Sequence, residues 1–351
     1  MSYLEQELGF GKGDIEVCLL RGGLLSLELE FTRKCNLRCL YCYASAGDPL
    51  EGEMTFEQIV DVVRQAKALG ARKIVLLGGG EPLLFPKFSE IVKEINSLRL
   101  SQVLFTNGVL LTPESCQFLF DNEVDVVIKH NSFVAEVQDT LAGVPGVHRL
   151  IRRGLRLLQE AGYPTDGRFL GIQSIICRQN YGEIEQMWEW ARERGITPYF
   201  EVLTRQGRAA KNPHLELSPE EIRDLFQRLA EIDKNHFNMQ WVPKPPVAGF
   251  TCRRHQYSCL VNSQGFVQPC PGIDIRLGNI LVKSLAEILQ GSDVIRDLRR
   301  VHERIDPACR NCCLSNDCYG CRGNAYQITG DYFACDPSCW LLKGRMATSQ
   351  S

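Results

Sequence analysis

Short apolar runs alternate with amphipathic segments from about residue 24 to about residue 205. The apolar runs have the length and composition of buried strands, and they predict strands at 24–31, 73–77, 102–105, 124–128, 169–176 and 198–203. Between them, apolar residues recur at helical spacing, which predicts helices at 55–69, 88–98, 113–122, 147–161 and 183–194. Thr55 with Gln58 forms an expected capping box, and Gly70, Gly162 and Gly195 stand where three of these helices end.

Strands that alternate with helices build βαβ units around a parallel sheet. Six such units predict an α/β fold, a partial (β/α)6 barrel of the TIM type. In barrels of this type the chemistry lies at the carboxyl ends of the strands. We expect the barrel to occupy residues 24–208, after an N-terminal extension over residues 1–23.

The pattern changes after residue 208. Ser218 is an expected N-cap, with Pro219 in the first helical position, for a helix that ends near residue 234. Residues 241–249 predict an extended, proline-rich linker, so helix and linker together cover 209–250. Residues 251–345 are rich in cysteine and predict a small α+β domain, with strands at 258–262 and 266–269 and helices at 284–289 and 293–302.

Composition narrows the class of protein. The 351-residue chain has a formal net charge of −2, which gives no electrostatic case for a nucleic-acid or membrane partner. The N-terminus lacks a basic segment followed by an apolar run, and no apolar stretch is long enough for a membrane span. We therefore expect a cytoplasmic protein. Sixteen cysteines in such a chain argue for bound metal rather than for disulfides.

Two motifs follow the first two predicted strands. Cys35, Cys39 and Cys42 form a C-x3-C-x2-C run. A cubane iron–sulfur cluster takes a thiolate at each of four irons, so three thiolates leave one iron open. Three unrelated buried thiols or part of a zinc site are the alternatives. The run Gly78-Gly-Gly80-Glu81-Pro82 lacks the Gly-Lys-Ser/Thr of a phosphate loop.

The cysteine spacing, with Tyr41 before the last cysteine, resembles the signature of the radical S-adenosylmethionine (SAM) superfamily. The Gly-Gly-Glu-Pro run resembles the motif that holds the methionine part of SAM in that family. The resemblance implies a [4Fe–4S] cluster on Cys35, Cys39 and Cys42, and SAM bound by Gly79, Gly80 and Glu81. It places Tyr41 against the adenine, with core packing as the alternative. It also implies a protein reductant such as ferredoxin or flavodoxin.

Polar residues at the ends of later strands are further candidates for SAM binding. They are Thr106 and Asn107 after the third strand, Asn131 and Ser132 after the fourth, and Arg208 after the sixth. An ordinary turn explains Thr106 and Asn107 equally well, and a structural salt bridge explains Arg208. His130 is expected to be a core or surface histidine, and Gln173 a residue of the barrel interior. No side chain is assigned as the catalytic one.

The C-terminal cysteines resemble the SPASM extension of radical SAM enzymes, in which two auxiliary [4Fe–4S] clusters bind. With the first cluster this implies three. Carried over, the ligands of the first auxiliary cluster are Cys252, Cys259, Cys270 and Cys321, and those of the second are Cys309, Cys312, Cys318 and Cys339. The Cys318–Cys321 gap is one residue shorter than the family pattern, and Cys313 and Cys335 are surplus. A zinc ribbon is the alternative. Cys18, Cys116 and Cys177 are expected to be buried as small apolar residues.

The resemblance implies reductive cleavage of SAM to a 5′-deoxyadenosyl radical, which takes a hydrogen atom from a substrate. The expected substrate is a peptide or protein side chain, with the auxiliary clusters handling electrons. The segment before Leu24 is too short for a leader-recognition domain. The tail over residues 318–339 is similar to that of heme-biosynthesis radical SAM enzymes, so tailoring of a heme or tetrapyrrole precursor is the alternative. A non-catalytic iron–sulfur or zinc protein is the third possibility.

Overall fold

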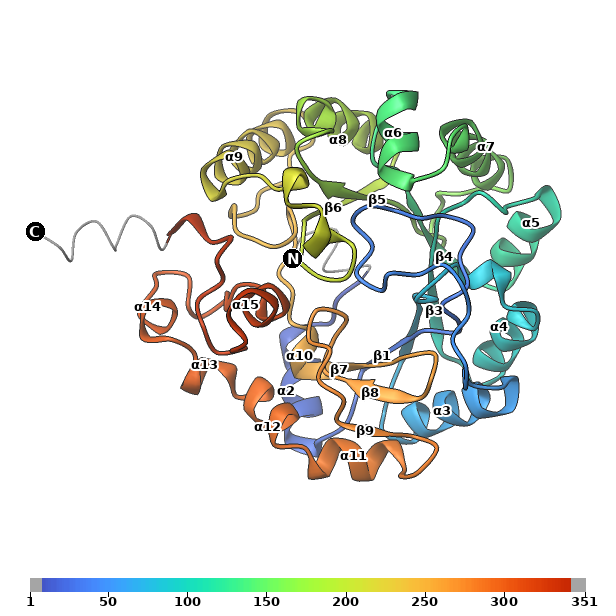
Figure 1. Cartoon of the computed structure of the whole chain (residues 1–351), viewed down its shortest axis with the longest axis vertical. Helices are drawn as coiled ribbons and strands as arrows, with labels where there is room; N and C mark the ends of the chain where they lie inside the picture. The colour runs from blue at the N-terminus through green and yellow to red at the C-terminus, as the bar shows by residue number, and fades with distance from the viewer. Residues whose placement is uncertain (1–7, 342–351) are drawn as a thin grey trace, which may run out of the picture.

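The computed structural model describes residues 8–341 and shows a sheet surrounded by helices (Figure 1). Residues 1–7 of the expected N-terminal extension and residues 342–345 of the expected C-terminal domain lie outside this range. In the described chain one sheet has nine strands in the order β6-β5-β4-β3-β2-β1-β7-β8-β9. The strands are β1 (Ser26–Leu29), β2 (Lys73–Leu76), β3 (Ser101–Thr106), β4 (Val124–Lys129), β5 (Leu170–Ile176), β6 (Thr197–Val202), β7 (Ser258–Val261), β8 (Phe266–Gln268) and β9 (Gly278–Asn279).

Helices cover the outer face of the first six strands (Figure 1). The five helices that the sequence predicted for this region are α3 (Phe56–Ala68), α4 (Phe88–Ser97), α5 (Pro113–Asp121), α7 (Val147–Glu160) and α8 (Ile184–Glu193). The structure adds α2 (Lys12–Arg21) before β1 and α6 (Ala135–Ala142) after β4, which the sequence analysis did not anticipate. The α/β fold with a mostly parallel sheet is confirmed.

One long helix precedes the linker, and among the described residues six shorter helices follow it along one side of the sheet (Figure 1). The long helix α9 (Pro219–His236) begins where the sequence predicted. The shorter ones are α10 (Arg254–Tyr257), α11 (Leu285–Gly291), α12 (Asp293–Arg299), α13 (Val301–Arg304), α14 (Pro307–Arg310) and α15 (Arg322–Thr329). The single helix expected at 293–302 is interrupted at Arg300, so α12 and α13 are separate.

Local signals set the ends of several helices. Thr55 caps α3 and Ser218 caps α9, and both form complete capping boxes, as the sequence predicted. Gly70, Gly162 and Gly195 have φ angles of 96°, 111° and 65°, the left-handed region that ends helices without a steric penalty.

The sheet separates two apolar layers. Alternate side chains of a strand point to opposite faces. Leu27, Leu29 and Leu76 belong to the large core between sheet and helices, and each is 0% exposed. Val103 and Phe105 of β3 belong to a smaller cluster on the inner face. The inner face is therefore partly apolar, and polar side chains gather where the strands end.

The C-terminal strands extend the sheet of the barrel. β7 pairs in parallel with β1, and Leu27 stands opposite Cys259 in that ladder. The linker runs along the other end of the sheet, where Val202 N donates to Pro246 O at 2.8 Å and Ala248 N donates to Phe200 O at 2.9 Å. These pairings hold the cysteine-rich segment next to the carboxyl ends of the barrel strands.

The structure also bears on membrane insertion. Across residues 8–341, no helix combines the length and the apolar character that a membrane crossing needs.

Candidate functional site

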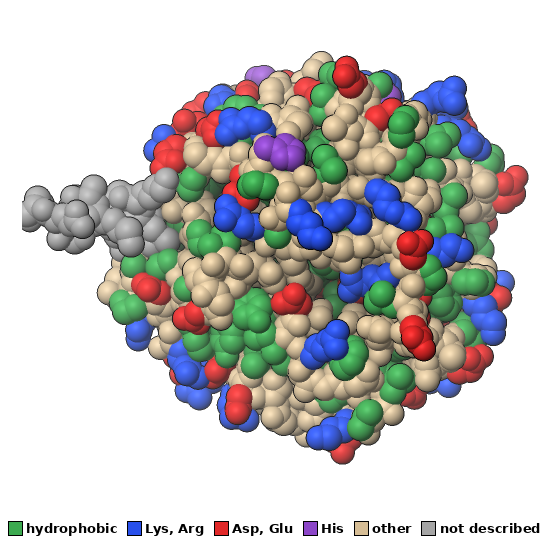
Figure 2. Space-filling model, in the orientation of Figure 1, with side chains coloured by type: hydrophobic (Ala, Val, Ile, Leu, Met, Phe, Trp, Pro, Cys, Tyr) green, Lys and Arg blue, Asp and Glu red, His purple; other side chains and the backbone are tan. Residues whose placement is uncertain are grey.

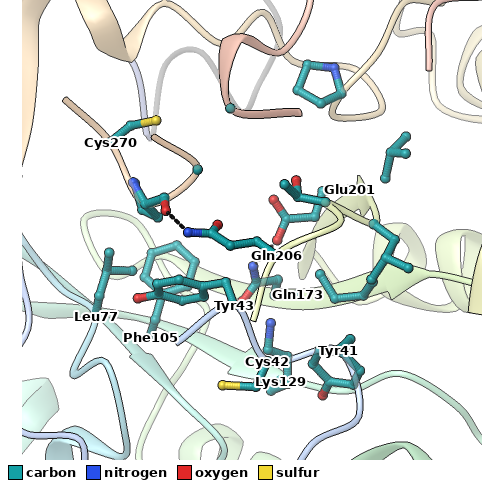
Figure 3. A pocket seen from close by; sticks show the side chains of 18 of the residues that line it. Tyr41, Cys42, Tyr43, Leu77, Phe105, Lys129, Gln173, Glu201, Gln206 and Cys270 are labelled. Carbon is teal, nitrogen blue, oxygen red and sulfur yellow. Dashed lines mark hydrogen bonds between the residues drawn. The ribbon is translucent and has the colours of Figure 1, made fainter. Parts of the chain in front are cut away.

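A cavity of about 270 Å³ opens at the carboxyl ends of the barrel strands. Figure 2 shows a hollow in this face of the molecule, with Lys and Arg side chains gathered along one side of it. Six cysteines line the cavity, namely Cys35, Cys39, Cys42, Cys252, Cys270 and Cys321. In Figure 3, Cys42 and Cys270 lie on opposite sides of it. The structure thus brings together cysteines that lie more than 200 positions apart in the sequence.

The loop that carries the first three cysteines is fixed by hydrogen bonds from distant segments. Arg208 donates from Nε to Cys39 O at 2.7 Å and from Nη1 to Ala46 O at 2.8 Å, and its backbone N donates to Cys42 O at 3.0 Å. Asn212 Nδ2 donates to Leu40 O at 3.1 Å. Arg208 lines the cavity, but its hydrogen bonds go to backbone carbonyls of the cysteine loop. The sequence predicted a SAM contact or a salt bridge for Arg208, not this role in holding the loop.

Two glycines allow other segments to approach this loop closely. A Cβ atom at Gly80 would lie 2.1 Å from Lys34 O, and one at Gly207 would lie 2.2 Å from Tyr43 O. Gly207 also has a φ of 59°, which side chains disfavour. Gly80 follows β2 and Gly207 follows β6, so the cysteine loop packs against the segments that follow these two strands.

Glu81 is buried at the end of β2 and is 2% exposed. It accepts hydrogen bonds from Thr106 Oγ1 at 2.7 Å, from Asn107 N at 2.9 Å and from Leu83 N at 3.3 Å. Burial raises the pKa of this carboxyl to about 7. Glu81, Thr106 and Asn107 all line the cavity beside Gly79 and Gly80. Glu81 is therefore a buried acid of the cavity and not a surface carboxylate.

The structure turns Asn131 and Ser132 away from the cavity. Asn131 donates from Nδ2 to the Tyr41 hydroxyl at 2.6 Å and accepts from Ile175 N at 2.9 Å. The Ser132 hydroxyl donates to Glu183 at 2.6 Å. Both side chains are 0% exposed and neither lines the cavity, so their role in SAM binding stays a prediction. Asn131 instead positions Tyr41, which does line the cavity.

Three polar side chains of β4, β5 and β6 face the cavity (Figure 3). Gln173 donates to Glu201, and the Lys129 ammonium lies 5.4 Å from the centre of the Tyr41 ring. Gln173 thus lies in the barrel interior, as the sequence suggested. His130, the next residue after Lys129, is 1% exposed and lines no part of the cavity, which confirms it as a core histidine.

The thiols of Cys35, Cys39 and Cys42 have the chemistry that a metal cluster needs. Burial raises the pKa of Cys35 to about 12 and also raises that of Cys39, so without metal these groups are neutral thiols. Metal ions bind thiolates, and binding therefore releases protons. Leu37 N donates to Cys35 Sγ and Ala46 N to Cys42 Sγ, both at 3.4 Å. Such bonds tune the potential of iron–sulfur clusters.

Within residues 8–341, no three His, Cys, Asp or Glu side chains lie close enough to hold a single metal ion. A cubane binds each ligand at a separate iron, so its ligands stand further apart than those of one ion. The arrangement therefore offers no ready zinc knuckle among the described cysteines.

A second group of cysteines does not line the cavity. Cys309 Sγ and Cys335 Sγ are 3.4 Å apart. Burial, together with the nearby Asp336, Cys318 and Cys309, raises the pKa of Cys339 to about 12. Cys335, surplus in the sequence pattern, thus lies among the expected ligands of the second cluster, whereas Cys313 is exposed. Cys18, Cys116 and Cys177 are buried, as predicted.

Two buried cationic or basic side chains at the cavity were missed by the sequence analysis. Arg322 is 0% exposed, and its Nη1 donates to the carbonyls of Tyr332 and Ala334, but Nε and Nη2 have no acceptor. His255 is 4% exposed, and its Nδ1 has no partner. A buried guanidinium with two unpaired nitrogen donors is costly unless a nearby anion compensates its charge. An iron–sulfur cluster with thiolate ligands is such an anion. The sequence does contain a signal for both residues, because each lies close to a cysteine: Arg322 directly follows Cys321, and His255 is the third residue after Cys252.

Two family models match the chain. Residues 29–191 match the Radical SAM superfamily, and residues 252–313 match the SPASM iron-sulfur cluster-binding domain.

Relatives of similar length differ in what their names say they make. The chain is 29% identical to the AdoMet-dependent heme synthase of Methanosarcina barkeri, over 90% of this chain and 96% of the relative. It is 29% identical to the PqqA peptide cyclase of Streptomyces rochei, over 92% of this chain and 91% of the relative. It is 29% identical to the mycofactocin maturase MftC of Mycolicibacterium smegmatis, over 84% of this chain and 77% of the relative.

Solved structures share the fold. Streptococcus suis SuiB bound to S-adenosylmethionine superposes with a TM-score of 0.70 at 16% identity, over 96% of this chain and 86% of SuiB. The structure of anSMEcpe with bound AdoMet and Cp18Cys peptide gives a TM-score of 0.70 at 17% identity, over 93% and 96% of the two chains.

Proposed function

Since this chain belongs to the radical SAM superfamily and carries a SPASM domain, we propose that it cleaves SAM in the cavity described above and modifies a peptide or protein side chain. The observation that carries this proposal is the shared cavity, which Cys35, Cys39 and Cys42 line together with Gly79, Gly80 and Glu81. When bound, the iron–sulfur clusters supply the electron that splits SAM into methionine and a 5′-deoxyadenosyl radical, and they exchange electrons with the substrate.

The residues after β2 and β3 would bind the methionine part of SAM. Oε1 of Glu81 already accepts from Thr106 and Leu83, but Oε2 accepts only from Asn107 N, so its second lone pair can accept a bond from the SAM ammonium. The ammonium would also favour the ionised carboxylate, which burial otherwise disfavours. Gly79 and Gly80 leave room for the backbone to approach the ligand. Tyr41, held by Asn131, would pack against the adenine.

The inner ends of β4, β5 and β6 would meet the substrate. Lys129, Gln173 and Glu201 offer an ammonium, an amide and a carboxylate on one wall of the cavity. These groups can hold the amides and side chains of a peptide while one carbon–hydrogen bond faces the SAM site. The names of two relatives, a peptide cyclase and a maturase, support a peptide substrate.

Production of 5′-deoxyadenosine by the Cys39→Ala variant tests the SAM site. After anaerobic purification and addition of dithionite, we expect 5′-deoxyadenosine to fall to background, since one thiolate of the cluster is missing. The iron bound by the C-terminal cysteines is expected to remain. Cys177→Ala, which removes a buried thiol outside the cavity, is the matched control and is expected to behave as wild type. Normal 5′-deoxyadenosine production by Cys39→Ala would overturn the site.

A heme or tetrapyrrole precursor is the second candidate substrate. The alignment with the heme synthase spans 96% of that relative, and the tail over residues 318–339 points the same way. A porphyrin with carboxylate side chains, added to the purified protein, distinguishes the two. A shifted porphyrin absorption band followed by SAM-dependent loss of carbon dioxide supports the second candidate. A SAM-dependent mass change in a peptide, with no porphyrin binding, supports the first.

A further inference from the structure

Only three of the four cysteines expected for the first auxiliary cluster reach the cavity. Cys252, Cys270 and Cys321 line it. Cys259 does not line the cavity. Its side chain is 0% exposed and packs in the core between the sheet and the helices.

The sheet register fixes the direction of Cys259. Cys259 pairs with Leu27 in the parallel ladder of β1 and β7, and paired residues of neighbouring strands point to the same face. Leu27 belongs to the outer core, whereas the next residue, Glu28, contacts Arg254 on the inner side. A one-residue slip would be needed to turn Cys259 inward, and it would move every side chain of β7 to the wrong face.

A buried histidine lies at the cavity that these three cysteines line. His255 follows Cys252 at a C-x2-H spacing and lines the same cavity. The imidazole is 4% exposed and Nδ1 has no hydrogen-bond partner. A buried polar atom without a partner is rare and calls for an explanation. Neutral imidazole is the form of histidine that binds metal.

We propose that the first auxiliary cluster is held by Cys252, Cys270 and Cys321 together with the imidazole of His255, and that Cys259 is not a ligand. The inference rests on the auxiliary clusters of the proposed function and assigns their ligands in this chain. A neutral imidazole in place of a thiolate makes the cluster less negative and raises its reduction potential. A cluster of this kind accepts an electron from a substrate radical more readily than one with four thiolates.

Iron content tests the role of Cys259. Four irons per cubane give about 12 per chain for three clusters. We expect Cys259→Ala to keep the wild-type iron and sulfide content, and Cys270→Ala to lose about four irons. Cys116→Ala is the matched control, because Cys116 is also 0% exposed in the same core and removes the same volume. A loss of about four irons from Cys259→Ala, with none from Cys116→Ala, would overturn the ligand set.

Pulsed electron paramagnetic resonance tests the role of His255. The parent is the Cys35→Ala/Cys39→Ala/Cys42→Ala variant reduced with dithionite, so that only auxiliary clusters contribute. We expect a coupling to a histidine nitrogen that His255→Ala abolishes. The control is His302→Ala, because the His302 ring lies 5.5 Å from the Tyr319 ring, which also contacts His255, but His302 does not line the cavity. Persistence of the coupling in His255→Ala, or its absence from the parent, would overturn the proposal.

These outcomes are separable from failure of the proposed function. A parent variant with no iron at all would overturn the auxiliary clusters and with them this ligand set. A parent with iron but no nitrogen coupling would overturn the role of His255 alone. Neither result affects 5′-deoxyadenosine production from the cluster on Cys35, Cys39 and Cys42, which is measured on the wild-type chain.

Discussion

Single residues decide how closely the cysteine loop approaches the barrel. Gly80 lies against Lys34 O, so even a methyl group there meets backbone that cannot rotate away. The loop must shift, and the three thiols shift with it. Burial of a titratable side chain is a second effect at the scale of one residue. The imidazole of His130 is buried and carries no charge in the folded state.

Gly80→Ala is expected to lose the first cluster. Iron per chain should fall from about 12 to about eight, and 5′-deoxyadenosine production should fall at least tenfold. Gly182→Ala is the control, since nothing lies within 4 Å of a Cβ atom at that position. Full iron content in Gly80→Ala would show that the loop tolerates the displacement.

His130 is expected to make the protein less stable in acid. Burial lowers its pKa from 6.5 to about 3, so below pH 6.5 the unfolded chain takes up a proton that the folded chain does not. Stability is therefore lost as the pH falls from about 6.5 towards 3. Between pH 7.5 and 5.5, His130→Gln should lose about 1 kcal/mol less than wild type.

Thermal unfolding of wild type and His130→Gln at both pH values measures this difference. Acid damage to bound clusters affects both proteins equally, so it cancels in the comparison. The exposed His214 provides the control, and His214→Gln should follow wild type. Parallel losses in His130→Gln and wild type would contradict the expectation.

At the scale of elements, caps and side-chain clusters fix the outer helices on the sheet. Asp233 of α9 accepts hydrogen bonds from Trp188 at 2.7 Å and from Arg192 at 2.8 Å, both in α8, and from Trp241 of the linker at 2.9 Å. The position of α9 therefore bears on the path of the linker that leads to Cys252. The helix itself starts at the Ser218 capping box.

Ser218→Ala removes the cap of α9 and is expected to cost about 1 kcal/mol of stability. The measurement is the unfolding midpoint in urea, with unchanged slope. Ser97→Ala removes only an exposed hydroxyl that bonds within α4, and it should change stability by less than about 0.5 kcal/mol. Equal effects of the two substitutions would show that the cap contributes nothing specific.

At the scale of the whole molecule, a buried ion pair joins the C-terminal segment to the barrel. Arg254 of α10 contacts Glu28 of β1 at 3.2 Å and donates to the hydroxyl of Tyr199 in β6 at 3.0 Å. The Glu28 side chain is 2% exposed. Arg254, a residue of the cysteine-rich segment, therefore connects β1 and β6, the first and the last strand of the barrel.

Arg254→Met leaves Glu28 buried without its partner and is expected to cost about 3 kcal/mol. Arg253→Met is the matched control, because Arg253 pairs with the exposed Asp317, and surface pairs contribute about 0–1 kcal/mol. Addition of Glu28→Gln to Arg254→Met should recover part of the loss. Thermal unfolding of the four proteins checks all three expectations, and equal losses in the two single arginine variants would disprove the coupling.

The amino-acid sequence by itself determined the elements and the family. Alternation of apolar runs and helical segments, together with capping residues such as Thr55 and Ser218, is local information, because the groups that satisfy it lie within a few residues. The two motifs after β1 and β2 are local as well. Those features predicted the fold and the radical SAM chemistry.

Only the tertiary structure decided which way several candidate side chains point. Cys259 faces the outer core because β7 pairs with β1 in one register, and the two strands lie more than 200 residues apart in the sequence. Asn131 bonds Tyr41 instead of lining the cavity, and Arg208 bonds the cysteine loop. His255 gains its place from the fold of α10 against that sheet. The direction of a side chain depends on pairing between distant strands, and no local pattern in the sequence records that pairing.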